Sequence, residues 1–200
     1  MNEASANPGL FHFDVEFEHT LQALRCLLAP EYLLAMRSAA SLLTQTLVRG
    51  GKLMLCGNGG SAADAQHIAS ELVGRFKASR RGLAALALTT DSSVLTAWSN
   101  DFSYNTVFSR QIESLSRPGD LVWGLSTSGN SRNIVEAFLA ARRCGCRTLG
   151  LLGRDGGALR DLSDIALLVP LDATDQIQTA HQLSYHALCA HLDAHFAEGA

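Results

Sequence analysis

Short apolar runs alternate with stretches of helical periodicity over most of this chain. The apolar runs are five or six residues long and predict buried strands at 52–56, 83–88, 121–125, 148–152 and 165–169. Helical spacing lies between them, at 61–78, 90–99, 104–115 and 131–143. Because strands joined by helices run parallel and are covered on both faces, we expect a five-stranded, mostly parallel sheet flanked by helices. This is a three-layer α/β fold of the flavodoxin or Rossmann type.

Further helices are predicted on either side of this alternating region. Apolar spacing indicates helices over 15–27, 31–49 and 175–197, and the pair Gly50-Gly51 ends the second of them. We expect the helix 31–49 and the C-terminal helix to be available for contacts between subunits. Residues 1–14 are predicted to be a tail, followed by one domain over 15–200.

The first candidate loop follows the strand predicted at 52–56. Its sequence is Gly-Asn-Gly-Gly-Ser-Ala-Ala-Asp, over 57–64. Ligands of parallel sheets bind beyond the carboxyl ends of the strands, and the free N–H groups of a helix start attract anions. The loop also fits a loose dinucleotide pattern, and it fits an ordinary strand-to-helix turn capped by Ser61. All three interpretations stay open on this loop alone.

The second candidate loop is more informative. Ser126-Thr127-Ser128-Gly129-Asn130-Ser131 follows the strand at 121–125 and opens the next helix. Its four hydroxyl groups can donate to phosphate oxygens at a helix N-terminus. Capping by Ser131 would need only one of them. The cluster therefore favours a phosphate site, and it weakens the nucleotide interpretation, which does not need a second loop of this kind.

Two helices carry candidate metal or acid/base groups. His67 and Glu71 share one helix face at i and i+4, a spacing that also occurs in solvated surface pairs. The last helix carries Gln178, His181 and His186. The two histidines lie about 140° apart around this helix, so one ion does not easily take both. Spacing alone does not decide which histidine joins Gln178.

Composition narrows the functional classes. Apolar residues make up 47% of the chain and charged residues 18%, with a formal net charge of −3. These values are typical of a globular protein and disfavour nucleic acid or an anionic membrane as a partner. The five cysteines contain no CxxC pair, which argues against a disulfide framework or a zinc ribbon. No segment is long enough to cross a bilayer and the start lacks a signal-peptide pattern, so we expect a cytoplasmic protein.

In combination, these motifs resemble the phosphoheptose isomerase family, within the sugar-isomerase (SIS) domain group. The resemblance spans about residues 31–197 and rests on motifs in matching order: Gly57-Asn58-Gly59-Gly60-Ser61, His67 with Glu71, Asn100-Asp101-Phe102, the loop 126–131, and Gln178 with His186. It implies that residues 15–200 form an SIS domain that includes the N-terminal helices.

The resemblance also implies an activity. The family converts sedoheptulose 7-phosphate to D-glycero-D-manno-heptose 7-phosphate through an enediol, the first step toward the ADP-heptose of lipopolysaccharide. It implies a homotetramer with active sites at subunit interfaces and one zinc ion per subunit, held by His67, Glu71, Gln178 and His186. Glu71 and His186 would be the acid/base pair. The implied substrate contacts are Asn58, Gly59, Gly60, Ser61, Glu71, Asn100, Asp101, Ser126, Thr127, Ser128, Ser131, Asp175 and Gln178.

Two points qualify the resemblance. The family often has Asp-Arg-Ile-Gln-Glu where this chain has Asp175-Gln176-Ile177-Gln178-Thr179, so a substrate or interface contact can differ. A related branch binds the bacterial replication initiator without isomerase activity, and it lacks the equivalents of Glu71 and His186. Both residues are present here, which favours the enzyme over this alternative, non-catalytic role.

Overall fold

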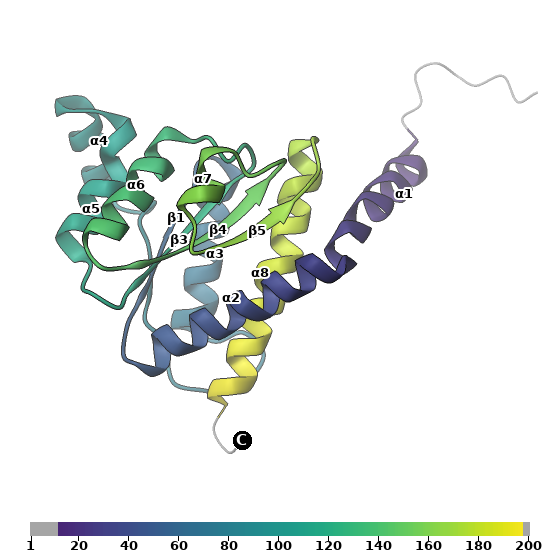
Figure 1. The fold of residues 1–200 in the computed structure, drawn as a ribbon, viewed down its shortest axis with the longest axis horizontal. Coiled ribbons are helices and arrows are strands. Elements are labelled where there is room, and N and C mark those ends of the chain that lie inside the picture. The colour runs from purple at the N-terminus through teal and green to yellow at the C-terminus, as the bar shows by residue number, and fades with distance from the viewer. Residues whose placement is uncertain (1–11, 198–200) are drawn as a thin grey trace, which may run out of the picture.

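A computed structural model describes residues 12–197 and contains one sheet of five parallel strands (Figure 1). The strands are β1 (Leu53–Cys56), β2 (Ala85–Ala87), β3 (Leu121–Ser126), β4 (Arg147–Gly153) and β5 (Ile165–Val169), in the order β2-β1-β3-β4-β5. The five-stranded α/β fold is thus confirmed. All four strand pairings are parallel, as expected when every connection contains a helix.

Helices cover both faces of this sheet. The α-helices are α1 (Phe13–Ala23), α2 (Pro30–Val48), α3 (Gly60–Val73), α4 (Ser92–Asp101), α5 (Val107–Leu115), α6 (Arg132–Arg143), α7 (Gly157–Leu162) and α8 (Thr174–Phe196). Two 3₁₀ helices, η1 (Leu24–Leu28) and η2 (Tyr104–Thr106), join α1 to α2 and α4 to α5.

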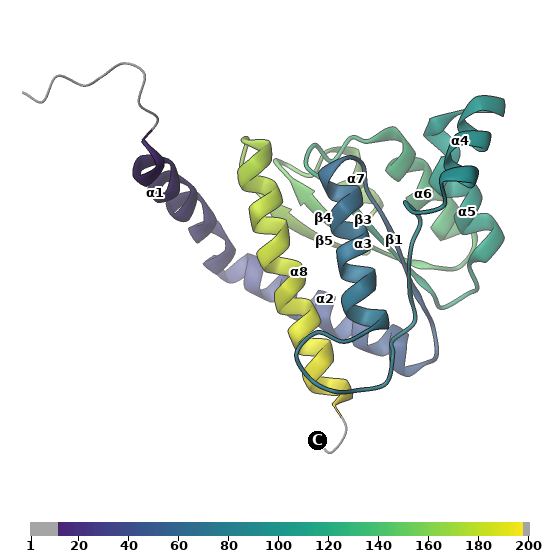
Figure 2. The same cartoon turned by 180° about the vertical axis from the view of Figure 1, so that it is seen from behind.

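Side chains of β1 divide the core into two layers. Leu53 and Leu55 pack in the cluster that contains α2, α3 and α8, whereas Met54 and Cys56 pack in the cluster that contains α5, α6 and α7. Successive strand residues point to opposite faces, so a continuous apolar run suits a strand covered on both sides. Figure 2 shows α3 and α8 side by side on one face, and this pair carries most of the candidate site.

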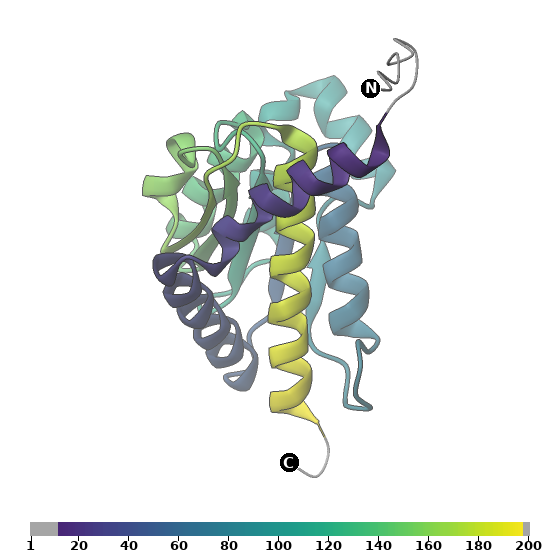
Figure 3. The same cartoon turned by 90° about the vertical axis from the view of Figure 1, so that its right-hand side faces the viewer.

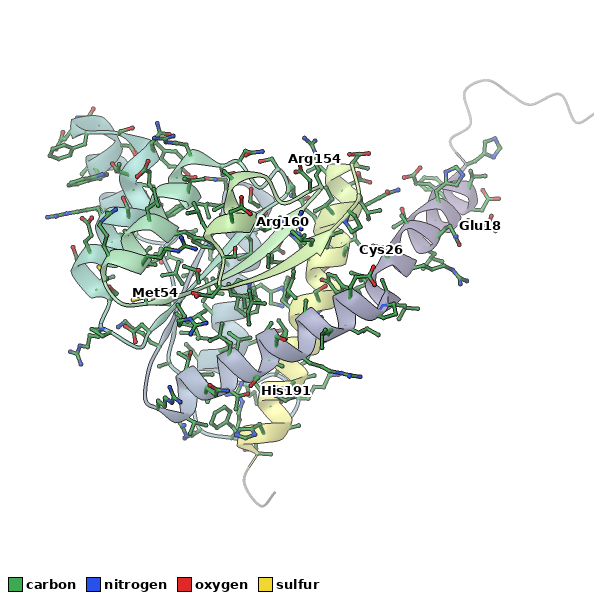
Figure 4. The ribbon with its side chains drawn as sticks, in the orientation of Figure 1. Glu18, Cys26, Met54, Arg154, Arg160 and His191 are labelled. Carbon is green, nitrogen blue, oxygen red and sulfur yellow. The ribbon has the colours of Figure 1, made fainter. Side chains whose placement is uncertain are left out.

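The N-terminal helices extend away from the sheet. No residue of α1 is buried, and Figure 1 shows this helix projecting beyond the three-layer body, whereas in the turned view of Figure 3 it passes in front of α8. The helix α2 packs against β5 and α8. Figure 4 labels His191 on α8 where α2 and α8 pass each other, and its Nε2 lies 3.3 Å from Oγ1 of Thr44. Over residues 12–197, no single helix is long and apolar enough to cross a membrane. One bent pair, Phe13–Leu28 with Pro30–Val48, meets the criteria of length and composition only.

Among the differences between the expected and observed element boundaries, three concern where a helix begins, ends or was not expected. The helix expected over 61–78 ends at Val73, because Gly74 leaves the helical conformation. The six-residue helix α7 was not expected, since it is too short to show a period. The helix α1 begins at Phe13, within the expected tail, and residues 1–11 of that tail lie outside the described residues.

Candidate active site

The first loop joins β1 to α3 with almost no intervening chain. A Cβ at Gly57 would lie 2.4 Å from the Ser61 carbonyl oxygen, so this approach requires glycine. Gly59 has a φ of +55° and occupies the N-cap, while Ser61 is buried in the first turn of α3. The capping role considered for Ser61 is therefore wrong, because the helix begins earlier, at Gly60.

The second loop gathers its hydroxyl groups at the start of α6. The Oγ atoms of Ser126 and Ser131 lie 3.1 Å apart, and Ser128 Oγ lies 3.5 Å from Ser126 Oγ. The backbone N–H of Gly129 donates to Ser126 Oγ at 3.1 Å. Ser131 occupies the N-cap of α6, but its side chain makes no capping hydrogen bond. Helix capping therefore does not account for this cluster.

Asn58 links the first loop to the first turn of α6, which follows the second loop. Its side-chain amide exchanges two hydrogen bonds with that of Asn133 on α6, at 2.9 and 2.8 Å. The hydroxyl of Tyr104 also donates to Asn58 Oδ1, at 3.0 Å. Sequence reasoning missed Asn133 and Tyr104. The only local signal was a polar residue at position 133, on a helix face that is otherwise apolar.

The helices α3 and α8 bring together three candidate metal ligands. The Oε1 atom of Glu71 lies 3.2 Å from Nε2 of His67 and 3.3 Å from Nε2 of His186. One ligand atom from each residue lies within 4.8 Å of the others. Glu71 is buried, and its second oxygen, Oε2, accepts no hydrogen bond from the described residues. Two imidazoles and a buried carboxylate with an unpaired oxygen are a suitable donor set for a divalent cation.

Groups behind this cluster hold it in place. The Tyr185 hydroxyl lies 3.3 Å from Asp64 Oδ1 and 3.1 Å from His67 Nδ1. Burial, and then the nearby charge of Asp64, raise the pKa of Tyr185, so this hydroxyl stays protonated. Burial also raises the pKa of Asp64, against the opposing hydrogen bond from Tyr185. On the outer side, the ring of Phe76 stacks on that of His186, with centroids 5.6 Å apart and planes 6° apart. Tyr185, Asp64 and Phe76 carried no signal in the sequence analysis.

A buried thiol lies next to the carboxylate. Burial, and then the Glu71 side chain, raise the pKa of Cys189, so the sulfur is a neutral thiol and not a thiolate ligand. Cys189 and Cys56 are both buried, as expected for core thiols, and the five cysteines are free.

The structure brings His186, and not His181, to Glu71. His181 is fully buried, and neither of its ring nitrogens makes a hydrogen bond of normal geometry. Burial lowers its pKa to about 4, against a smaller opposing effect of the Leu152 backbone. Helical spacing left the choice between these two histidines open, and the packing of α8 against α3 places only His186 beside the carboxylate.

Gln178 lies at the other end of the α3–α8 contact. A Cβ on Gly60 would lie 2.4 Å from its Nε2, so the Gln178 amide packs on the start of α3. It precedes His186 by eight positions, which is about 12 Å along α8 at 1.5 Å per residue. Gln178 therefore adjoins the first loop, and its role as a fourth ligand stays a prediction.

Three predicted substrate contacts lie apart from both clusters. The amide of Asn100 donates to Asp101 Oδ1 at 2.9 Å, and both residues are exposed at the end of α4. Asp175 is exposed in the first turn of α8, where its negative charge interacts favourably with the helix dipole. Within residues 12–197, no hydrogen bond or ion pair joins these side chains to the loops or to the His67 cluster.

Comparison with known proteins identifies the family. The SIS domain profile matches residues 16–153. The chain is 58% identical over 152 residues to the phosphoheptose isomerase of Geobacter sulfurreducens, covering 76% of this chain and 80% of that one. It is 46% identical over 177 residues to the phosphoheptose isomerase of Crocosphaera subtropica, covering 88% and 90%.

Solved structures agree with the sequence comparison. The fold matches phosphoheptose isomerase from Neisseria gonorrhoeae with a TM-score of 0.83 and 41% identity, over 91% of this chain and 97% of that one. It matches a phosphoheptose isomerase from Francisella tularensis with a TM-score of 0.86 and 35% identity, over 91% and 96%. With both loops and the His67–Glu71–His186 cluster in place on this fold, the chain belongs to the phosphoheptose isomerase family of SIS-domain proteins.

Proposed function

We propose that this protein is an aldose–ketose isomerase that converts sedoheptulose 7-phosphate to D-glycero-D-manno-heptose 7-phosphate. The observation that carries the proposal is the convergence of Glu71 and His186, from two helices far apart in the chain, on a fold that also carries a phosphate-type loop. The relatives named phosphoheptose isomerase support the substrate class. Turnover of sedoheptulose 7-phosphate by the purified protein tests it directly.

The serine loop is suited to hold the phosphate of such a substrate. Its hydroxyl groups lie at the N-terminus of α6, where unpaired N–H groups and the helix dipole attract an anion. The phosphate takes no part in the isomerisation, so binding it serves to fix C1 and C2 near the acid/base groups. Ser126, Thr127, Ser128 and Ser131 have this role in the proposal, and Asn58, Gly59, Gly60 and Ser61 line the neighbouring loop.

Glu71 and His186 supply the proton transfers. Isomerisation removes a proton from one carbon, protonates the oxygen that gains charge, and returns a proton to the adjacent carbon. A carboxylate and an imidazole within hydrogen-bond distance of each other can divide these tasks and exchange a proton between them. The burial of Glu71 keeps water away from the carboxylate.

The cluster also fits a divalent cation, which we propose to be zinc, one per subunit. His67, Glu71 and His186 would hold it, with Gln178 as the predicted fourth ligand. Such a cation supplies polarisation of the substrate carbonyl and stabilises the negative charge of the enediolate. The Oε2 atom of Glu71 supports this assignment, because this buried oxygen makes no hydrogen bond of normal geometry and only the weak thiol donor of Cys189 lies beside the carboxylate, which favours a positively charged neighbour.

We further propose a homotetramer with active sites at subunit interfaces, acting in the cytoplasm on the route to lipopolysaccharide heptose. Phe17 and Leu21 on α1 are 64% and 66% exposed, and Leu34 on α2 is 64% exposed. Exposed apolar side chains on two successive helices favour burial against another subunit. Asn100 and Asp101 would then complete the site of a neighbouring copy. Light scattering of the purified protein tests the assembly.

The alternative of a non-catalytic protein that binds the replication initiator explains less. It gives no reason for a buried carboxylate to sit between two imidazoles. We therefore retain the isomerase as the proposed function.

A further inference from the structure

The hydroxyl of Tyr185 lies directly behind the metal cluster. Tyr185 is fully buried on α8, one position before His186, and its ring meets that of His67 edge to face at a centroid distance of 5.6 Å. The hydroxyl oxygen lies between Oδ1 of Asp64, at 3.3 Å, and Nδ1 of His67, at 3.1 Å. Asp64 and His67 stand one turn apart on α3, so both face the same point of α8.

The direction of these hydrogen bonds follows from the number of protons. A tyrosine hydroxyl has one proton to donate, and the carboxylate of Asp64 can only accept when it is ionised. A charge-assisted bond to this carboxylate is the stronger use of that proton. The tyrosine oxygen is then left to accept from its other neighbours, the side chain of Gln182 and His67 Nδ1, so this nitrogen carries the hydrogen of the 3.1 Å contact. A neutral imidazole has only one N–H group, so Nε2 keeps a free lone pair.

This arrangement leaves two acceptors facing each other. The lone pair of His67 Nε2 lies 3.2 Å from the carboxylate oxygen Oε1 of Glu71, which also can only accept when it is ionised. His186 Nε2 approaches the same oxygen at 3.3 Å. Acceptors at this separation repel each other unless a positive charge lies near them, which a bound cation provides.

We propose that Asp64 and Tyr185 are positioning residues that fix His67 in the tautomer protonated at Nδ1, so that Nε2 is preset to bind a cation. The inference rests on the proposed metal site, and it extends that site by two residues that do not touch the metal. Outer hydrogen bonds of this kind orient a ligating imidazole and raise its affinity for metal. The chain Asp64–Tyr185–His67 differs from the common direct pair of carboxylate and imidazole, because a phenol stands between them.

The test replaces Tyr185 with Phe, which removes the hydroxyl and keeps the ring. The matched control is Tyr32→Phe. Tyr32 is also buried, and its hydroxyl lies 2.6 Å from Ser184 Oγ on the same helix, but it has no link to His67. Asp64→Asn is a second variant, whose neutral amide accepts the tyrosine proton more weakly. The dissociation constant of zinc is measured for each metal-free protein by competition with a chromophoric chelator.

We expect Tyr185→Phe to weaken zinc binding by roughly 10- to 100-fold, the usual effect of losing an outer hydrogen bond to a metal ligand. Asp64→Asn should weaken it in the same direction, and Tyr32→Phe should match the wild type. In the metal-free wild type, ¹⁵N NMR of labelled histidine should show His67 protonated at Nδ1. In Tyr185→Phe, this preference should be lost.

Two results would overturn the inference. One is a wild-type His67 protonated at Nε2, and the other is a Tyr185→Phe protein that keeps both the wild-type affinity and the wild-type tautomer. If the wild type binds no zinc, the proposed metal site fails, and the NMR measurement alone then decides the inference.

Discussion

His186 Nε2 lies 3.3 Å from Glu71 Oε1, although the two residues come from helices that are far apart in the chain, α8 and α3. The contact exists because α8 packs beside α3 after the chain has completed the whole sheet (Figure 2). Neither helix alone could present this pair. The packing of α8 on α3 therefore sets the distance between the proposed acid and base, and any change that separates the two helices also separates these two side chains.

The serine loop gives the first prediction. Ser126→Ala and Ser128→Ala should each raise KM for the sugar phosphate by roughly 10- to 100-fold, because a hydrogen bond to a charged group contributes roughly 1.5–3 kcal/mol. Steady-state kinetics measure the effect. Ser114→Ala is the control, since that hydroxyl is exposed on α5 and donates only to its own helix. An unchanged KM in both loop variants would contradict phosphate binding by this loop and leave it only a structural role.

Removal of metal gives the second prediction. We expect a chelator to abolish turnover and added zinc to restore it, with metal analysis giving one ion per subunit. His67→Ala should lose bound metal because it removes one of three converging ligands. His191→Ala, on the far part of α8 next to Thr44, should keep it. Full activity in protein shown to be free of metal would exclude the zinc role.

His181 should make the fold sensitive to acid. Its pKa is about 4 in the folded protein and 6.5 ordinarily, so the unfolded chain binds the extra proton between these values. The stability linked to the neutral, buried His181 is fully present above pH 6.5. It is lost progressively as the pH falls from 6.5 toward 4. A shift of this size corresponds to roughly 3 kcal/mol in the free energy of unfolding.

Urea unfolding at pH 7 and at pH 4.5 measures this effect. The loss of stability between the two pH values should be smaller in His181→Gln than in the wild type. The comparison is made within each protein, so a cost of the substitution at pH 7 does not affect it. Equal losses in both proteins would show that other groups cause the acid sensitivity.

A buried ion pair should stabilise the contact between α3 and α8. Arg80 Nε donates to Asp193 Oδ1 at 2.6 Å, and both side chains are almost fully buried. The same guanidinium donates to the carbonyl oxygens of Glu71, at 2.8 Å, and Leu72, at 3.0 Å, and so caps the end of α3. Burial alone would raise the pKa of Asp193, but backbone N–H groups and Arg80 lower it overall.

Asp193→Ala should therefore lower the free energy of unfolding by about 3–5 kcal/mol, because it leaves a buried cation without its partner. Arg143→Ala is the control, since its pair with Glu113 is exposed and should contribute less than about 1 kcal/mol. Urea denaturation measures both. A small effect at Asp193, similar to that at Arg143, would contradict the importance of this ion pair.

Hydrophobic periodicity and local motifs in the sequence predicted the sheet and, within the site, the two loops and the His67–Glu71 pair. The run at 53–56 reads as a buried strand because every residue is apolar, and His67 with Glu71 is visible as an i,i+4 pair. Helical spacing did not show the choice of His186 over His181, because it depends on how α8 rotates against α3, and only the family resemblance implied His186. Asn133 and Tyr185 were missed for the same reason. Their partners lie far away in the chain, and only the assembled fold shows that their polar atoms meet.

The most direct measurement is an assay of the purified protein with sedoheptulose 7-phosphate and zinc, run beside Glu71→Gln and His186→Gln. Both substitutions keep the approximate size of the side chain and remove a group that can take or give a proton. We expect turnover to the aldose phosphate by the wild type, and a kcat lower by roughly a hundredfold or more in each variant. Circular dichroism verifies that the variants are folded. No turnover by the wild type, or variants that match it, would contradict the account.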